Sequence, residues 1–183
     1  MIHIVWIKLL ERRMLKGMYF RKGFKYFAIF CCLISCLKAE ASGINSHLIS
    51  VEEISNRLVD DSNVVFIDIR KVDAFKYAHV KNAVNIWRSE YVDTSYAYGG
   101  MMPKRAQFAE FLSSLGVKTN DRIIVYDGRG GCEAARFWWI LKCYGHTNAF
   151  VVDGGFEAFE SYGFEITGHE TNVTASNYQF REE

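Results

Sequence analysis

Three runs of four apolar residues constrain the fold more than any other feature of this sequence. They are Val64 to Ile67, Ile123 to Tyr126 and Ala149 to Val152. A strand without a polar position is buried on both faces, and such strands occur mainly in parallel sheets that are covered by helices. Ala83 to Ile86 is expected to form another short strand of the same kind.

Stretches with helical character separate these runs. Ser50 followed by Glu53 is a capping-box pattern at the start of a helix. Further helices are expected over 71–77, over a stripe from Phe108 to Leu115, over 133–144 and after the Gly154-Gly155 turn. The alternation predicts an α/β fold, a single domain with a parallel β-sheet flanked by helices on both faces. Its core is expected over about 50–167, and the polar tail after Thr167 is expected to lie outside it.

The first residues differ from the rest in charge. Residues 1–38 carry eight Lys/Arg and one acid, whereas the whole 183-residue chain has a net charge of +1. The neutral total gives no sign of a nucleic-acid partner. A basic flank precedes the apolar run from Tyr26 to Leu37, which is shorter than the ~20 residues that span a bilayer. Ala39-Glu40-Ala41 follows, so residues 1–41 are predicted to be a secretory signal peptide cleaved before a domain over 42–183.

Two other interpretations of the leader stay open. Leu33-Ile34-Ser35-Cys36 is similar to a bacterial lipoprotein signal, in which Cys36 would be lipidated and become the first mature residue. The third interpretation is an uncleaved membrane anchor. We therefore predict an exported protein, in a bacterial periplasm or anchored in a membrane facing it. The membrane would be contacted only through a lipid anchor or an uncleaved leader.

The most promising site is the turn from Asp127 to Cys132, between an expected strand and an expected helix. Ligands of open α/β sheets bind beyond the carboxyl ends of the strands. Gly128, Gly130 and Gly131 would let backbone N–H groups converge, and the helix N-terminus would add partial positive charge. The turn therefore predicts a place for an anion or a thiolate. Its spacing fits neither dinucleotide nor P-loop motifs, and the sequence shows no Cys or His spacing of a metal site.

Several segments in a fixed order resemble those of one known family. They are Phe66–Arg70, Tyr77–Ile86, Met102–Pro103 with Phe108, Leu115–Val117, Ile124–Asp127, Ala135–Trp139, Gly145-His146 and Val152–Phe156. The chain resembles the rhodanese family, most closely the N-terminal half of tandem-domain thiosulfate and 3-mercaptopyruvate sulfurtransferases. The resemblance implies transfer of sulfane sulfur from a small anionic donor, through a cysteine persulfide, without a metal or nucleotide cofactor.

The sequence departs from the catalytic members of that family at one position. They carry the persulfide-forming Cys directly after the strand, where this chain has Asp127. The N-terminal domains of the tandem enzymes also carry Asp there and are not the catalytic half. Three hypotheses follow. Cys132 acts as a displaced nucleophile, the chain is a non-catalytic module that binds an anion or a protein, or it pairs with a separate catalytic rhodanese domain.

The charged residues in and around the turn are expected to bind backbone N–H groups, an anionic donor or one another. Asp127 is expected to accept loop N–H groups and lock the turn. Arg129 is interpreted either as a ligand for an anionic donor or as a solvated loop residue. Asp68 and Arg70 are expected to support the site by pairing with Arg136 or with loop amides.

Other residues are assigned to packing. Cys143, Trp138 and Trp139 are expected in the core. An internal disulfide between Cys132 and Cys143 is not expected if both lie on one helix, because eleven helical residues span ~16 Å. His79 and His146 are expected to be packed and hydrogen-bonded at the ends of elements. The long loop over 87–102, rich in Tyr and Gly, is expected either to cover the Asp127–Cys132 turn or to dock a partner.

Overall fold

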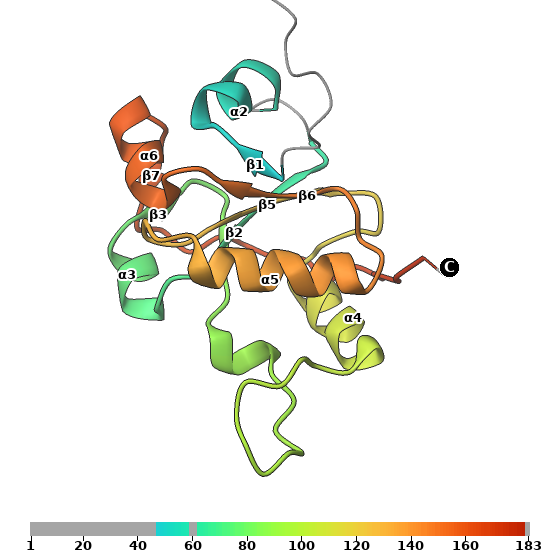
Figure 1. Cartoon of the computed structure of the whole chain (residues 1–183). Coiled ribbons are helices and arrows are strands. Elements are labelled where there is room, and N and C mark those ends of the chain that lie inside the picture. Colours follow the sequence, from blue (N-terminus) through green and yellow to red (C-terminus); the bar gives the residue numbers. More distant parts are fainter. Residues whose placement is uncertain (1–46, 59–61, 182–183) are drawn as a thin grey trace, which may run out of the picture. The chain divides into compact units, whose positions relative to one another are not determined.

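The computed structural model describes residues 47–58 and 62–181 of the chain (Figure 1). Within these ranges the main sheet has the strand order β1-β6-β5-β2-β4, and every pairing in it is parallel. Its strands are β1 (Leu48–Ile49), β2 (Val64–Asp68), β4 (Val84–Asn85), β5 (Arg122–Tyr126) and β6 (Ala149–Val152). The predicted parallel sheet is confirmed. A small antiparallel pair, β3 (His79–Val80) and β7 (Ile166–Thr167), was not predicted, because two residues carry no readable periodicity.

Helices cover both faces of the main sheet, as Figure 1 shows. Helices α4 (Arg105–Ser114) and α5 (Cys132–Cys143) pack on one face, while α2 (Val51–Arg57) and α6 (Gly155–Tyr162) pack on the other. The short helix α3 (Val72–Tyr77) adds Phe75 to the second of these cores.

Strand β5 shows why the apolar runs lack a polar position. Ile123 and Val125 belong to the core under α4 and α5, whereas Ile124 and Tyr126 belong to the core under α2 and α6. Successive side chains of a strand point to opposite faces. Because both faces are covered, all four side chains are fully buried. This arrangement brings the carboxyl ends of β2 and β5 together at one edge of the sheet.

The C-terminal tail corrects one expectation. Residues 168–181, the part of the tail that the structure describes, form no helix or strand, yet Tyr178 and Phe180 are buried in the core beside α4. The backbone N–H of Tyr178 donates to Ser113 Oγ at 2.9 Å, and Ser176 N donates to Ser113 O at 2.9 Å. The core therefore extends past residue 167. The polar composition of the tail gave no indication that Tyr178 and Phe180 pack into the core.

Tyr178 also binds one of the buried histidines. Its hydroxyl lies 2.8 Å from His146 Nδ1, and both side chains are buried. Burial lowers the pKa of His146 below its usual value, because the charged imidazolium would lose its hydration.

We therefore expect acid to weaken the fold through His146. The unfolded chain takes up a proton on this residue near the ordinary histidine pKa of ~6.5, whereas the folded domain resists it, so stability falls as pH drops through that range. Thermal unfolding at several pH values should show this loss in the wild type and a smaller loss in His146→Gln. Equal pH dependence in the two proteins would contradict the assignment.

Helix α5 corrects two further expectations. Trp139 is 50% exposed and Cys143 is exposed, although both were expected in the core. Trp138 is partly buried, and its indole N–H donates to Ala149 O at 2.9 Å. The helix turns ~100° per residue, so with Phe137 and Ile140 facing the sheet, Trp139 faces outward.

The predicted leader lies outside the described residues. This applies to residues 1–41, including Cys36. Within the described ranges, the helices are too short or too polar to cross a membrane.

Candidate functional site

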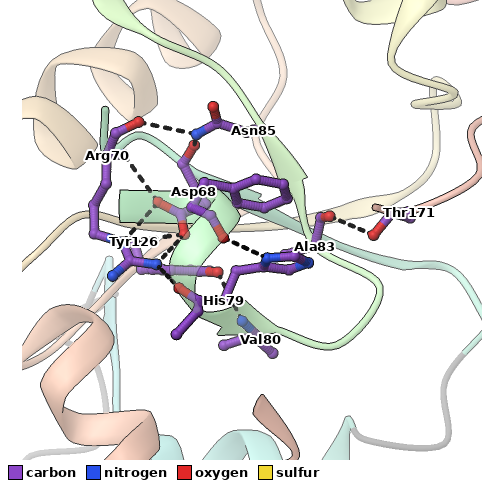
Figure 2. A network of polar contacts seen from close by, with 10 residues as sticks. Asp68, Arg70, His79, Val80, Ala83, Asn85, Tyr126 and Thr171 are labelled. Atoms are coloured by element: carbon purple, nitrogen blue, oxygen red, sulfur yellow. Dashed lines mark hydrogen bonds and ion pairs between the residues drawn. The ribbon is translucent and has the colours of Figure 1, made fainter. Parts of the chain in front are cut away.

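A buried ion pair lies at the carboxyl end of β2 (Figure 2). The Asp68 carboxylate is fully buried and accepts hydrogen bonds from Arg70 Nε and Nη2, the latter at 2.7 Å. Arg70 Nη2 also donates to Ala78 O at 2.6 Å. The guanidinium carbon lies 3.6 Å from the centre of the Phe156 ring, so the cation is stacked on α6.

Two neighbouring strands contribute side chains that lie next to Asp68 and Arg70. The Tyr126 hydroxyl, from β5, accepts the backbone N–H of Val80 at 3.2 Å. Burial, and after it the charge of Asp68, raises the pKa of Tyr126 far above its usual range, so the phenol stays neutral. Asn85 Nδ2, from β4, donates to Asp68 O and Arg70 O, each at 2.9 Å. The side chains of the pair thus contact Ala78 at the end of α3, Tyr126 of β5 and Phe156 of α6, while Asn85 of β4 binds the backbone of the same two residues. This is a supporting role.

Arg136 is not part of this network, contrary to expectation. Its Nη2 donates to Gly100 O at 2.5 Å, in the long loop that follows the short 3₁₀ helix η1 (Arg88–Tyr91). Arg70 satisfies Asp68 from two residues away, so Arg136 is free to hold that loop.

The turn after β5 is organised around the Asp127 side chain. Asp127 Oδ1 accepts the N–H of Gly131 at 2.9 Å. Its Oδ2 lies 3.2 Å from the N of Glu133 and 3.4 Å from the N of Ala134, both of which donate to it. These are the N–H groups of the turn and of the first residues of α5. The carboxylate therefore occupies the place where a helix N-terminus would otherwise hold an external anion.

The glycines of the turn do not all serve the predicted purpose. Gly131 has φ +71° and is the N-cap of α5, a conformation in which L side chains are strained. Gly128 and Gly130 have open space where a Cβ would lie, and neither has a positive φ. Convergence of the N–H groups thus depends on Gly131 and on the Asp127 carboxylate that collects them.

Helix α6 supports the turn from the other side. The N–H of Phe156 donates to Asp127 O and Gly128 O, each at 2.8 Å. Gly155, with φ +60°, approaches so closely that a Cβ there would lie 2.3 Å from Gly128 O. Arg129 is 80% exposed, with Nη1 3.6 Å from Glu157 Oε2. It therefore lies at the rim of the turn, paired weakly with an acid of α6.

Cys132 and Cys143 mark the two ends of α5. Both are exposed free thiols. Cys132 is the first residue of the helix, one position beyond the glycine N-cap. In sequence it lies between Gly131 and Glu133, whose backbone N–H groups both donate to the Asp127 carboxylate.

The long loop is fixed to the start of α5. Arg88 Nη1 binds Glu133 Oε1 at 2.9 Å, and Tyr91 packs edge-on against Phe137. Burial, together with the charge of Glu133, raises the pKa of Tyr91 to about 12. The loop thus lies beside the first turns of α5, near the Asp127 turn, and it exposes Tyr96 and Tyr98. Sequence reasoning missed Glu133, whose partner lies 45 residues away.

The described residues contain no group of three or more His, Cys, Asp or Glu side chains arranged to hold a metal ion. The polar groups that gather at the carboxyl edge of the sheet are instead one ion pair and one carboxylate, each bound by the protein itself.

Comparison with known proteins places this architecture in a family. The model of the rhodanese-like domain matches residues 50–162. The thiosulfate/3-mercaptopyruvate sulfurtransferase 2 of Arabidopsis thaliana is 27% identical over 137 residues, covering 70% of this chain and 40% of that protein. The thiosulfate sulfurtransferase of Gallus gallus is 35% identical over 95 residues, covering 51% of this chain and 33% of that protein.

Solved structures agree on the fold. The crystal structure of SseA from Escherichia coli, a 3-mercaptopyruvate sulfotransferase with the rhodanese fold, matches with a TM-score of 0.66 at 19% identity. The match covers 75% of this chain and 57% of that one. The chain thus spans less than two thirds of the length of each of these three proteins. From the family match over residues 50–162 and the helix-covered parallel sheet, we conclude that the chain belongs to the rhodanese-like domain family.

Proposed function

We propose that this chain serves sulfane-sulfur transfer as a rhodanese domain that has Asp127 in place of a nucleophile directly after β5 and works beside a catalytic rhodanese domain. The observation that carries the proposal is the Asp127 carboxylate, which accepts N–H groups from Gly131, Glu133 and Ala134. The names of the relatives, thiosulfate and 3-mercaptopyruvate sulfurtransferases, support the sulfur chemistry.

The chemistry of the first transfer step explains why Asp127 excludes catalysis at this position. A thiolate attacks the outer sulfur of thiosulfate, the S–S bond breaks, and sulfite leaves with the electron pair. A carboxylate forms no persulfide and cannot replace the thiolate. The carboxylate also accepts hydrogen bonds from the N–H groups that would otherwise bind an anionic donor, and its negative charge repels the charge of that donor. The small anionic donor would therefore bind on the catalytic domain.

A second candidate function has one observation in its favour. Cys132 is an exposed thiol at the first residue of α5, so a donor could reach it from solvent. In that case the domain would carry sulfane sulfur on Cys132 and transfer it to an acceptor thiol or to cyanide. We rank this function second, because the N–H groups of the turn bind Asp127 instead of a group on Cys132.

A turnover assay separates the two functions. The purified chain is incubated with thiosulfate and cyanide, and separately with 3-mercaptopyruvate and cyanide, and thiocyanate is measured. We expect the wild type and Cys132→Ser to form the same amount of thiocyanate, equal to the amount formed in a control without protein. Thiocyanate formed by the wild type but not by Cys132→Ser would reject the first function and support the second.

The proposed partner can be sought directly. A tagged chain captured from its native cells should retain a rhodanese domain that carries Cys directly after the strand equivalent to β5. Capture without such a domain, together with turnover by the chain alone, would contradict the pairing.

We also propose that the protein is exported, from the basic and apolar composition of residues 1–41. The mass of the mature protein distinguishes the routes. Cleavage before Ser42 indicates a signal peptidase, a lipid-modified N-terminal Cys36 indicates a lipoprotein, and an intact N-terminus indicates an anchor. An intact chain found only in the cytoplasm would contradict export.

A further inference from the structure

The outward face of α5 is exposed and partly apolar. Trp139 is 50% exposed, and Cys132, Ala135 and Cys143 are exposed as well. The opposite side of the helix is buried against the sheet through Ala134, Phe137, Ile140 and Leu141. Figure 1 shows α5 lying along the outside of the sheet. A half-exposed Trp on a regular helix is a common anchor of protein interfaces, because its burial removes a large apolar area from water.

Three exposed residues of α5, together with the half-buried Arg136, follow the spacing of a helix–helix seam. Cys132, Arg136, Trp139 and Cys143 are separated by four, three and four residues. This is the heptad spacing that keeps one side of a helix against a second helix. The seam therefore fits another helix lying along α5.

The same residues are complementary to themselves when the second helix is antiparallel. We place a two-fold axis perpendicular to the two helices, midway between positions 137 and 138. Cys132 then lies at the same height along the helix pair as Cys143 of the second copy, that is, level with it, and Glu133 is level with Lys142 of the second copy. A thiol then meets a thiol and a carboxylate meets an ammonium group. Because the axis is two-fold, each pairing occurs twice.

The centre of the seam is complementary as well. Arg136 is half-buried and donates to Gly100 O within its own chain. In the antiparallel pair it is level with Trp139 of the second copy, which would place a guanidinium beside an indole. Within the chain, the Glu133 side chain is 26% exposed and is paired with Arg88, and Lys142 Nζ donates to Thr147 O at the opposite end of the helix. The two charges thus lie at opposite ends of one helix, where a parallel second copy would place like charges level with each other.

We propose that two copies of this chain associate through antiparallel packing of their α5 helices, with Trp139 at the centre of the interface. The inference is independent of the sulfur chemistry proposed above. A catalytic domain docking on the same face would compete with the second copy, and the experiments below distinguish the two occupants.

The cysteines at the ends of the seam provide the readout. With helix axes ~8–10 Å apart and Cα atoms ~2.3 Å from each axis, level residues on facing sides lie within the ~7 Å that a disulfide tolerates. Within one chain the two cysteines are ~16 Å apart along α5 and cannot bridge. A bridge between Cys132 and Cys143 is therefore a signature of the antiparallel pair.

Oxidised glutathione, a small-molecule disulfide, supplies the oxidant. The thiolate of Cys132 displaces one glutathione thiolate to give a mixed disulfide, and the thiolate of Cys143 of the second copy then displaces the other glutathione. Two protein thiols are oxidised to one disulfide, and one glutathione disulfide is reduced to two glutathione thiols.

The test uses the full chain with Cys31, Cys32 and Cys36 replaced by Ser, so that Cys132 and Cys143 are its remaining thiols. We expect a covalent dimer after treatment with oxidised glutathione, and peptide mapping should find Cys132 joined to Cys143. Adding Cys132→Ser should abolish the covalent dimer, because antiparallel packing holds the two Cys143 residues apart. Bridges mainly between like cysteines, or no covalent dimer, would overturn the proposal.

Sedimentation without oxidant gives a second test. Trp139→Glu should raise the dissociation constant of the dimer at least ~10-fold. Tyr162→Glu is the matched control, because Tyr162 is 47% exposed on α6 and lies outside the seam. Circular dichroism confirms that both variants fold. A wild type that stays monomeric up to ~100 μM, or a Trp139→Glu variant with unchanged association, would overturn the interface.

Discussion

Replacing Asp68 by Ala is expected to destabilise the domain by about 3–5 kcal/mol, the usual cost of removing one partner of a buried ion pair. The substitution leaves the Arg70 guanidinium, whose side chain is 13% exposed, without its counter-charge. The damage would spread because Arg70, held in place by Asp68, also donates to Ala78 O, and because the buried Tyr126 lies beside the Asp68 carboxylate. Denaturant unfolding measures the change in free energy.

An exposed ion pair on α2 provides the control for Asp68. Glu53 pairs with Arg57 at 3.1 Å, with side chains 46% and 73% exposed. Glu53→Ala is expected to cost only ~0.3–0.5 kcal/mol, as exposed pairs one helical turn apart usually do. If the two substitutions cost the same, the Asp68–Arg70 pair does not organise the carboxyl edge of the sheet.

Gly155→Ala is expected to have the second large effect, about 3–5 kcal/mol, from backbone strain and a steric clash together. The new Cβ would lie 2.3 Å from Gly128 O and 2.8 Å from Asp127 O. Backbone oxygens cannot rotate away, so either α6 or the Asp127 turn must shift. The shift would also weaken the bonds from Phe156 N to those oxygens.

Gly163 offers a matched comparison at the other end of α6. It also has a positive φ, +88°, but no atom lies within 4 Å of a Cβ built there. Gly163→Ala should therefore cost only the ~1–2 kcal/mol of the left-handed conformation. The difference between the two variants measures the contact between α6 and the turn. An equal loss at both positions would show that this contact contributes nothing.

The fold was predictable because its determinants are local in sequence. The apolar runs of β2, β5 and β6 predicted strands that contact helices on both faces of the sheet. Ser50 does cap α2, because its side chain accepts the N–H of Glu53 at 3.1 Å. The tail was not predictable, because Tyr178 and Phe180 reach the core through contacts with residues such as Ser113, 65 positions away. No periodicity records such a contact.

The site was predictable only in its centre. An Asp at the start of a glycine-rich turn before a helix commonly accepts nearby N–H groups, so the role of Asp127 follows from local chemistry. The partner of Arg136 does not follow, because Gly100 lies 36 residues away in a loop without regular structure. Trp139 could have been placed correctly, since Phe137 and Ile140 already define the inward side of α5.

The central claim is that the Asp127 turn carries no sulfur and that the domain depends on another domain for its nucleophile. The most direct measurement is the intact mass of the purified chain after incubation with thiosulfate, because this detects the first transfer step without an acceptor. We predict no added sulfur that depends on Cys132, so wild type and Cys132→Ser should behave alike. A gain of one sulfur atom that cyanide removes, and that is absent in Cys132→Ser, would contradict the account.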